Sequence, residues 1–317
     1  MDKQNKYSFG VDVGGTTVKL GLFQVNGSLQ EKWEIQTRTE DAGKDILPDI
    51  ARAIHEKIKE RNLHKEDIHG IGMGIPAPVN SKGIVQNTAN IGWGYKEVKR
   101  ELEELTNLRV KVANDANVAA LGEMWLGGGQ GYCNVVLATL GTGVGGGIIV
   151  RSEEIVGEHG SGGEIGHILV EPKEQESCGC GRCGCLEQYA SATGIVRLAK
   201  RRLQEDDMPS ILRDKELSAK EVFDAVKEND KVAIEIARTF GEYLGKAFAT
   251  IAAIVDPAVF VIGGGVSKAG EILLEFIEEP YRKHTFFANK DVKFELAKLG
   301  NDAGICGAAK LIIEAAQ

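Results

Sequence analysis

The sequence lacks the features that mark membrane, secreted and nucleic-acid-binding proteins. No run of eighteen apolar residues occurs in its 317 residues, so a membrane-spanning helix is not expected. The first ten residues, MDKQNKYSFG, carry charges with no apolar segment behind them, which argues against a secretory signal peptide. There is no stripe of Lys and Arg, and the formal net charge of -8 disfavours a nucleic acid partner. We expect a cytoplasmic protein.

Cysteine is scarce outside one segment. Only Cys133 and Cys306 lie beyond the stretch CGCGRCGCLE, residues 178–187, which holds the other four. Disulfides are rare in a reducing cytosol, so clustered cysteines there indicate metal ligands or redox groups. With 43% hydrophobic and 26% charged residues, the chain has the composition of a globular protein, and its length suits two lobes.

Apolar and polar residues alternate on both sides of Gly14-Gly15, which predicts a strand, a tight turn and a second strand over residues 7–23. A further strand is expected at 29–37, a helix at 44–62, a strand at 68–78, a helix near 95–106, a strand at 109–115 and a helix over 116–126. Strands followed by crossover helices indicate an α/β protein.

The strand, glycine turn and strand pattern returns at residues 132–150, which suggests two lobes built on related sheets with a cleft between them. Ser218 with Glu221 forms a potential capping box, and Asp230 is a plausible N-cap of a helix that continues to Val255. A strand near 258–262 leads into a glycine turn and a helix, and residues 301–317 form a last helix. The basic run 200–202 is expected on a solvated helix face, and the hinge near 114–118.

Glycine is abundant, at 40 residues, and it is clustered in short turns. The first turn combines backbone N–H groups with two hydroxyls and a cation, which suits phosphate oxygens, and a preceding carboxylate could hold Mg²⁺ through water. These residues are Asp12, Gly14, Gly15, Thr16, Thr17 and Lys19. The alternative is an ordinary hairpin with a Gly-Gly turn.

Two further glycine turns strengthen the phosphate interpretation. LGTGVGGG, residues 140–147, lies between apolar strands, and two such turns facing each other could clamp the polyphosphate of a nucleotide. A third turn, Gly263 to Gly265, would then be free to approach the nucleoside. By its spacing alone, the third turn could equally be a tight connection between a strand and a helix.

Asn114 and Asp115 stand where a strand ends and a helix begins. Both residue types are favoured N-caps. The functional alternative makes Asp115 a general base that accepts a proton from a hydroxyl group, while Asn114 orients the substrate. Both interpretations hold if Asn114 caps the helix and Asp115 points toward substrate.

The cysteine segment follows a histidine, and together they suit zinc. One imidazole and three thiolates close a tetrahedral structural site, but His167, Cys178, Cys180, Cys183 and Cys185 are five candidates for four places. A redox pair at Cys180 and Cys183 lacks the expected βαβ context. A metal would also hold Glu164 and Glu187 near His167. Such a rigid group of polar side chains suits the binding of a polyol. The alternative is that both glutamates are ordinary surface charges.

The motifs DVGGTTVK, NDANVAALGE, LGTGVGGG, GEIGH, CGCGRCGCLE and VIGGGVS occur in the order and spacing of the ROK family of repressors and sugar kinases. The chain resembles this family from about residue 7 to 316, and most closely its bacterial ATP-dependent glucokinase branch. The resemblance implies an α/β fold of the two-lobed, actin-like ATPase (ribonuclease H-like) type, a cleft that closes on sugar, and a homodimer or dimer of dimers. Only six residues precede Tyr7, so no winged helix-turn-helix of the repressor type is expected.

The resemblance also assigns roles to residues. It implies Asp115 as catalytic base and His167, Cys178, Cys180 and Cys185 as zinc ligands, with Cys183 spare but not excluded. Sugar contacts would come from Asn90, Asn114, Asp115, Glu164, His167 and Glu187. ATP contacts would come from Asp12, Gly14, Gly15, Thr16, Lys19, Gly141, Thr142, Gly143 and Gly263 to Gly265.

We therefore expect phosphorylation of the 6-hydroxyl of D-glucose by ATP, with Mg²⁺ and structural Zn²⁺. Other acceptors known in the family stay open: N-acetylglucosamine, N-acetylmannosamine, fructose and allose. So do polyphosphate as donor and, outside enzymes, a sugar-sensing regulator without catalysis. The expected domains are residues 1–117 with 301–317, and residues 118–300 with the zinc loop.

Overall fold

The computed structural model describes residues 6–88 and 90–315. The chain divides into two compact units. Unit 1 comprises residues 1–133, 147–163 and 298–317, and unit 2 comprises residues 134–146 and 164–297. The segment 114–118, predicted as a hinge, therefore lies inside unit 1. The predicted domain limits stay a prediction.

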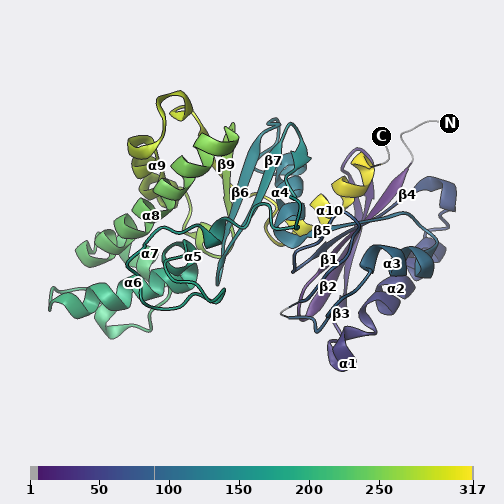
Figure 1. Ribbon diagram of the computed structural model, residues 1–317, viewed down its shortest axis with the longest axis horizontal. Coiled ribbons are helices and arrows are strands. Elements are labelled where there is room, and N and C mark those ends of the chain that lie inside the picture. Colours follow the sequence, from purple (N-terminus) through teal and green to yellow (C-terminus); the bar gives the residue numbers. More distant parts are fainter. Residues whose placement is uncertain (1–5, 89, 316–317) are drawn as a thin grey trace. The chain divides into compact units, whose positions relative to one another are not determined.

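The first sheet has the strand order β3-β2-β1-β4-β5 and belongs to unit 1 (Figure 1). Its strands are β1 (Tyr7–Val13), β2 (Thr17–Gln24), β3 (Leu29–Gln36), β4 (Ile68–Ile75) and β5 (Val110–Asn114). Strands β1 and β2 form the predicted hairpin, and β4 and β5 run parallel to β1 and to each other. The helices of this unit are α1 (Glu40–Gly43), α2 (Ile46–Glu60), α3 (Val98–Thr106), α4 (Asp115–Leu126) and α10 (Ala303–Glu314).

The second sheet has the strand order β10-β9-β6-β7-β8. Its strands are β6 (Val135–Leu140), β7 (Val144–Val150), β8 (Glu153–Glu154), β9 (Val259–Gly263) and β10 (Lys293–Leu296). The helices of unit 2 are α5 (Glu187–Ala190), α6 (Ala192–Glu205), α7 (Ala219–Lys227), α8 (Lys231–Val255) and α9 (Ile272–His284). The predicted N-caps are confirmed: the Ser218 side chain accepts from Glu221 N–H and that of Asp230 from Ala233 N–H.

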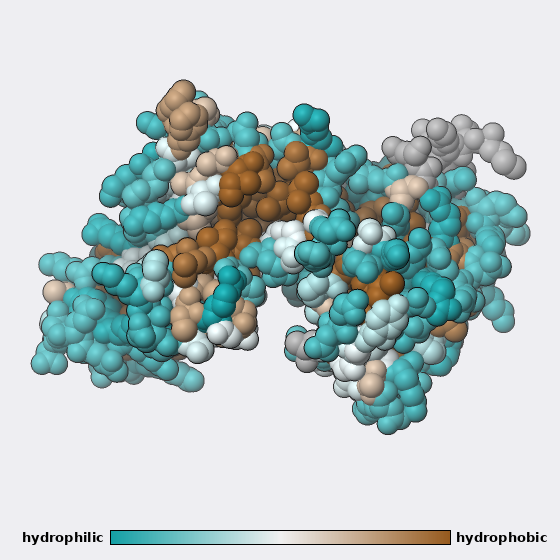
Figure 2. Space-filling view, in the orientation of Figure 1, coloured by the Kyte–Doolittle hydropathy of each residue, from teal (hydrophilic) through white to brown (hydrophobic). Residues whose placement is uncertain are grey.

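After β9 and the glycine turn, a short 3₁₀ turn at residues 266–269 precedes the predicted helix, which is α9 and begins at Ile272. One local prediction needs correction. The basic run on α6 is only partly a solvated face: Lys200 is exposed, but Arg201 pairs with Glu174 and Arg202 with Glu235. The surface over α6 and α7 is nevertheless hydrophilic (Figure 2). Among the described residues, no helix combines the length and apolar character needed to cross a membrane.

Helix α10 packs on the first sheet through backbone-to-backbone contacts. A Cβ on Gly10 would overlap the carbonyl oxygen of Ile305, and one on Gly72 would overlap that of Ala308. On the other side, a Cβ on Gly307 would overlap the carbonyl oxygen of Val118 in α4. A larger side chain at Gly10 or Gly72 would force α10 away from the sheet, and one at Gly307 would force it away from α4, in each case with a large loss of packing energy. The close approach also brings the start of α10 next to Asp12.

Glu154 is an ionisable group that unit 1 buries without compensation. It lies on β8, and its Oε2 atom is buried with no hydrogen-bond partner among the described residues. Burial raises the pKa of Glu154 to about 7; Glu314 raises it further and Lys111 opposes the rise. The folded chain therefore keeps this proton to higher pH than the unfolded chain does.

We predict that Glu154→Gln stabilises the protein at pH 8 but not below pH 5. The folded pKa of Glu154 lies above its ordinary value of 4.5, so the free energy of unfolding falls as pH rises from about 4.5 to about 7. The shift corresponds to at most about 3 kcal/mol. Urea unfolding at both pH values measures it, with the exposed neighbour Glu153→Gln as control. An equal effect of both substitutions, or none for Glu154→Gln at pH 8, contradicts the prediction.

Candidate active site

The first glycine turn joins β1 to β2 and is held by backbone and threonine hydrogen bonds. Gly14 N–H donates to the carbonyl of Thr17 at 3.0 Å, and the Thr37 hydroxyl donates to the carbonyl of Gly14 at 2.7 Å. Gly15 and Thr16 at the tip are exposed. Asn90 lies beside this tip, since a Cβ on Gly15 would be 3.7 Å from the Cβ of Asn90. The structure thus brings two predicted segments of unit 1 together.

Asp12 is a partly buried carboxylate just before this turn. Burial raises its pKa, and Lys19, opposite it on β2, lowers it. The Lys19 ammonium donates to the carbonyl of Asn301 at 3.3 Å. A Cβ on Gly304 would lie 2.6 Å from Cγ of Asp12, so only glycine fits at this position of α10. A cation bound at Asp12 would stabilise the ionised form that burial disfavours.

Asn114 and Asp115 occupy the junction of β5 and α4, as predicted. Asn114 is the N-cap: its Oδ1 accepts from the N–H groups of Ala116 and Asn117, and its Nδ2 donates to the carbonyl of Ala77. Asp115 is the first helical residue, and one carboxylate oxygen accepts from Ala116 N–H at 2.8 Å. The cap interpretation is therefore correct for Asn114, and Asp115 follows it as the first residue of α4.

Asp115 and Asp12 lie near each other in unit 1. A Cβ on Gly74, in β4, would be 3.6 Å from the Cα of Asp115 and 3.8 Å from Oδ1 of Asp12. The absence of a side chain at Gly74 leaves space between the two carboxylate-bearing residues. This arrangement can hold a cation and accept a proton in one region.

His167, Cys178, Cys180 and Cys185 converge in unit 2, with all four ligand atoms within 4.8 Å of one another. Sγ of Cys180 and Sγ of Cys185 are 3.6 Å apart, and Sγ of Cys178 is 3.8 Å from Nδ1 of His167. Two sulfurs bound at about 2.3 Å to one tetrahedral ion lie about 3.8 Å apart. The donor set and the spacing therefore fit structural zinc. Cys183 lies outside the group and contacts the carbonyl of Gln175.

The ionisation of the thiols fits the same interpretation. Burial raises the pKa of Cys178 and of Cys185. A hydrogen bond from the backbone of Arg182 is the main cause that lowers the pKa of Cys180 to about 6. Only one of the three thiols is thus readily ionised by its protein surroundings. A divalent cation would supply the positive charge that lets the others ionise.

Glu187 connects the cysteine group to the second glycine turn. Its Oε1 accepts from Sγ of Cys178 at 2.8 Å and lies 3.8 Å from Nδ1 of His167. A Cβ on Gly143 would lie 2.6 Å from Oε2 of Glu187, so a larger residue in the turn would displace this carboxylate. Glu164 is exposed, and its backbone carbonyl accepts from His167 N–H; the position of its carboxylate beside a sugar stays a prediction.

The second glycine turn, residues 141–143, is attached to the start of α6. Ala192 N–H donates to the carbonyl of Gly141 at 2.7 Å, and the Thr193 hydroxyl donates to that of Thr142 at 2.7 Å. Gly141 N–H closes the turn on the carbonyl of Gly143. Sequence reasoning did not find Ser191 or Thr193. Their position four and six residues after Glu187 would have been a signal, because they follow the Cys-x-Glu motif directly.

The third glycine turn lies beside the second. Gly263 pairs with Thr139 across parallel strands β9 and β6. Gly264 has φ of +83°, and a Cβ there would lie 2.6 Å from the backbone of Leu140. The structure therefore groups Gly263 to Gly265 with the second glycine turn in unit 2. A Gly at position 264 is required both by its left-handed backbone and by this close approach.

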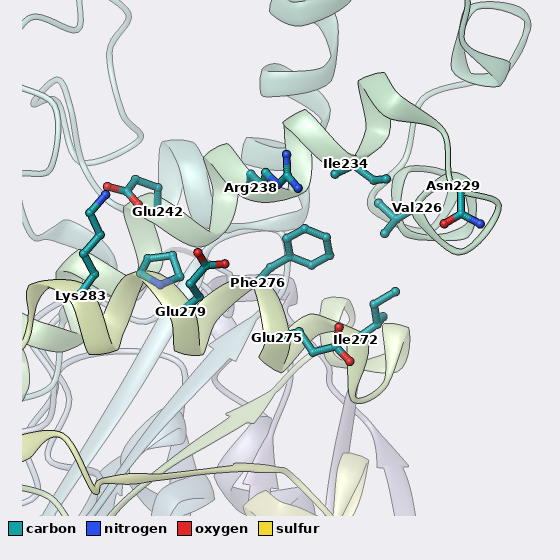
Figure 3. Close-up of a pocket in the computed structure, with 11 residues that line it drawn as sticks. Val226, Asn229, Ile234, Arg238, Glu242, Ile272, Glu275, Phe276, Glu279 and Lys283 are labelled. Atoms are coloured by element: carbon teal, nitrogen blue, oxygen red, sulfur yellow. The ribbon is translucent and has the colours of Figure 1, made fainter.

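Two neighbouring cavities adjoin Thr142 and Thr193. One, of about 380 Å³, is lined by Gly143, Cys178, Glu187 and Arg197 as well. The other, of about 630 Å³, extends between α6 and the start of α7 past Lys200 and Leu217. A third cavity of about 550 Å³ lies between α7, α8 and α9, where Phe276 and charged side chains such as Arg238 line it (Figure 3). It contains none of the predicted site residues.

Ion pairs hold the segment before the cysteines against α6. The nearly buried carboxylate of Glu174 pairs with Arg197 and Arg201 and accepts from the Tyr189 hydroxyl. The hydrogen bonds with Arg201 and Tyr189 keep the pKa of Glu174 far below its usual range. This network was not predicted, since nothing in the local pattern of residues 171–177 shows which distant cations face it.

Known proteins resemble this chain over almost its full length. A glucokinase of Halalkalibacterium halodurans is 42% identical over 314 residues, covering 97% of this chain and 95% of the relative. A ROK hexokinase of Thermus thermophilus has a crystal structure with a TM-score of 0.81, 31% identity and 96% coverage of each chain. A ROK glucokinase of Streptomyces griseus, crystallised with glucose and AMPPNP, has a TM-score of 0.74, 34% identity, and coverage of 96% of this chain and 98% of its own.

These neighbours confirm the α/β fold class of the two-lobed, actin-like ATPase type that the sequence predicts. The sequence pattern described as "ROK family" matches residues 8–315. This match covers nearly all of the chain, and each of the three relatives exceeds 30% identity. The chain belongs to the ROK family.

Proposed function

We propose that the protein is a sugar kinase that transfers the γ-phosphoryl group of ATP to the 6-hydroxyl of D-glucose. The observation that carries this is the position of Glu187, whose carboxylate contacts both Cys178 of the metal-ligand group and Gly143 of the second phosphate turn. Acceptors for sugar hydroxyls and donors for phosphate oxygens therefore adjoin within unit 2. The relatives named glucokinase support phosphorylation of a sugar.

ATP is the donor we propose, because the Streptomyces griseus relative was crystallised with AMPPNP and glucose. The cavity of about 630 Å³ beside Thr142 has room for a nucleoside, and the third glycine turn lies on the same unit. In unit 1, Asp12 would hold Mg²⁺ through water, which bridges and neutralises the phosphates. The N–H groups of Gly14 to Thr16 would bind phosphate oxygens.

Asp115 is the proposed general base. Its carboxylate would accept the proton of the 6-hydroxyl as the hydroxyl oxygen attacks the γ-phosphorus in line. Zinc would be structural, because His167 and the three cysteines fill all four places of a tetrahedral ion. The ion would keep Glu187 and the His167 ring in fixed positions for the sugar.

The proposed acceptor and donor are tested with a panel of sugars and donors. We expect kcat/KM with glucose and ATP to exceed that with N-acetylglucosamine, N-acetylmannosamine, fructose or allose, and polyphosphate to be a poor donor. Coupled ADP production measures the ATP reactions, and phosphosugar chromatography serves all donors. A higher value for another hexose would replace glucose as the acceptor, and no turnover with any pair would overturn the kinase assignment.

Asp115→Asn should lower kcat by about 10² to 10⁴ and leave glucose affinity within about threefold, because loss of a positioned base removes proton acceptance and not binding. Stopped-flow or coupled assays give kcat, and calorimetry gives the glucose dissociation constant. Zinc content and melting temperature should match the wild type. A variant that turns over at nearly the wild-type rate would show that Asp115 is not the base.

Cys180→Ser should lose zinc and, with it, glucose affinity, whereas Cys183→Ser should keep both. The two cysteines share one loop, but only Cys180 belongs to the ligand group. Loss of the ion frees His167 and Glu187, so we expect the glucose KM to rise by on the order of tenfold or more. Elemental analysis gives zinc per chain. Equal zinc loss in both variants would mean that the ligand assignment is wrong, and intact glucose affinity without zinc would refute the scaffold role.

A further inference from the structure

The start of α6 holds the second glycine turn by hydrogen bonds to the carbonyl groups of the turn. The carbonyls of Gly141, Thr142 and Gly143 accept from Ala192 N–H, the Thr193 hydroxyl and Gly141 N–H. In a trans peptide unit the C=O and the following N–H point in opposite directions. Fixing the carbonyls of Gly141 and Thr142 toward α6 therefore turns the N–H groups of Thr142 and Gly143 away from it.

Thr193 is not needed for the helix that carries it. Ser191 is the N-cap of α6 and its hydroxyl already accepts from Gly194 N–H at 2.9 Å. The Thr193 hydroxyl instead donates to a residue 51 positions earlier in the chain. Thr193 is exposed and lines both cavities beside the turn. Its hydroxyl thus acts on the turn and not on helix stability.

Ser191 extends the connection to the sugar side. Its hydroxyl is 2.6 Å from the carbonyl of Glu187, to which it donates, and 2.9 Å from the hydroxyl of Thr193. The two hydroxyls carry two protons for three contacts: the Glu187 carbonyl, the Thr142 carbonyl and each other. In the structure the two carbonyls accept both protons, so the contact between the two hydroxyls lacks one. Loss of either carbonyl contact would release a proton for a bond between the hydroxyls.

We propose that Thr193 and Ser191 are positioning residues. The Thr193 hydroxyl orients the N–H of Gly143 toward the transferred phosphoryl group, and the Ser191 hydroxyl links this orientation to the position of Glu187. The inference rests on the proposed kinase function of the same site. Donors fixed in advance stabilise charge that develops during transfer, whereas a freely turning peptide does not. Binding of a sugar by Glu187 would then favour the orientation of the turn that accepts nucleotide, which makes the two affinities interdependent.

The test compares Thr193→Val, which removes the hydroxyl but keeps the shape, with Thr193→Ser, which restores the hydroxyl. Thr193→Val should lower kcat with glucose and ATP by on the order of tenfold or more, because one phosphate donor loses its orientation. It should weaken AMPPNP binding without changing glucose binding in the absence of nucleotide. Thr193→Ser should recover most of both losses. Thr250→Val removes an exposed hydroxyl that donates to a carbonyl within α8 and serves as control.

Calorimetry with AMPPNP, with and without glucose, measures the coupling independently of turnover. Glucose should tighten AMPPNP binding to the wild type, and Ser191→Ala should reduce that effect while zinc content stays unchanged. Wild-type AMPPNP affinity and kcat in Thr193→Val would overturn the proposal, as would equal losses in Thr193→Ser and Thr193→Val. If the wild type binds AMPPNP but phosphorylates no sugar, the proposed function fails, while the AMPPNP affinities of the variants still decide the role of Thr193.

Discussion

The contact between Gly143 and the carboxylate of Glu187 is the constraint on which the site in unit 2 depends. A Cβ at residue 143 would overlap Oε2 of Glu187, so a larger residue there would displace this carboxylate from its place beside the second glycine turn. The cysteine group holds Glu187 from the other side through Sγ of Cys178. The carboxylate of Glu187 therefore adjoins both the cysteine group and the second glycine turn.

Unit 1 positions its site by a comparable close approach. Gly10 and Gly72 let α10 lie directly on the sheet, and Gly304 at its start leaves space for the carboxylate of Asp12. Asp115 begins α4, which packs against α10 on the side of Gly307. The two aspartates are thus held by the same helix pair. Backbone contacts have less freedom than side-chain contacts, which suits groups whose position decides a reaction.

Both sites contain ionisable groups whose charged forms the fold disfavours. Burial raises the pKa of Asp12 and of Cys178, in each case at a place where the sequence suggests a cation. Burial has the same effect on Glu154, which belongs to none of the predicted motifs. The raised pKa of a buried acid therefore does not identify a site by itself. The converging donor atoms around Cys178 and the first glycine turn beside Asp12 distinguish these two residues from Glu154.

Local patterns in the sequence were sufficient for the hairpin at Gly14-Gly15, the helix caps at Asn114, Ser218 and Asp230, and the choice of His167 with the cysteines. Each depends on residues close together in the chain or on ligand chemistry that few residue types supply. Spacing alone left five candidates for four places; the family resemblance named Cys178, Cys180 and Cys185, and the structure brings these three together with His167 while Cys183 lies apart. Gly304 beside Asp12, Thr193 beside Thr142 and the arginines around Glu174 were decided only by tertiary structure. Their partners are 23 to 292 positions distant in the chain, and no local periodicity indicates which distant backbone or charge a residue will meet.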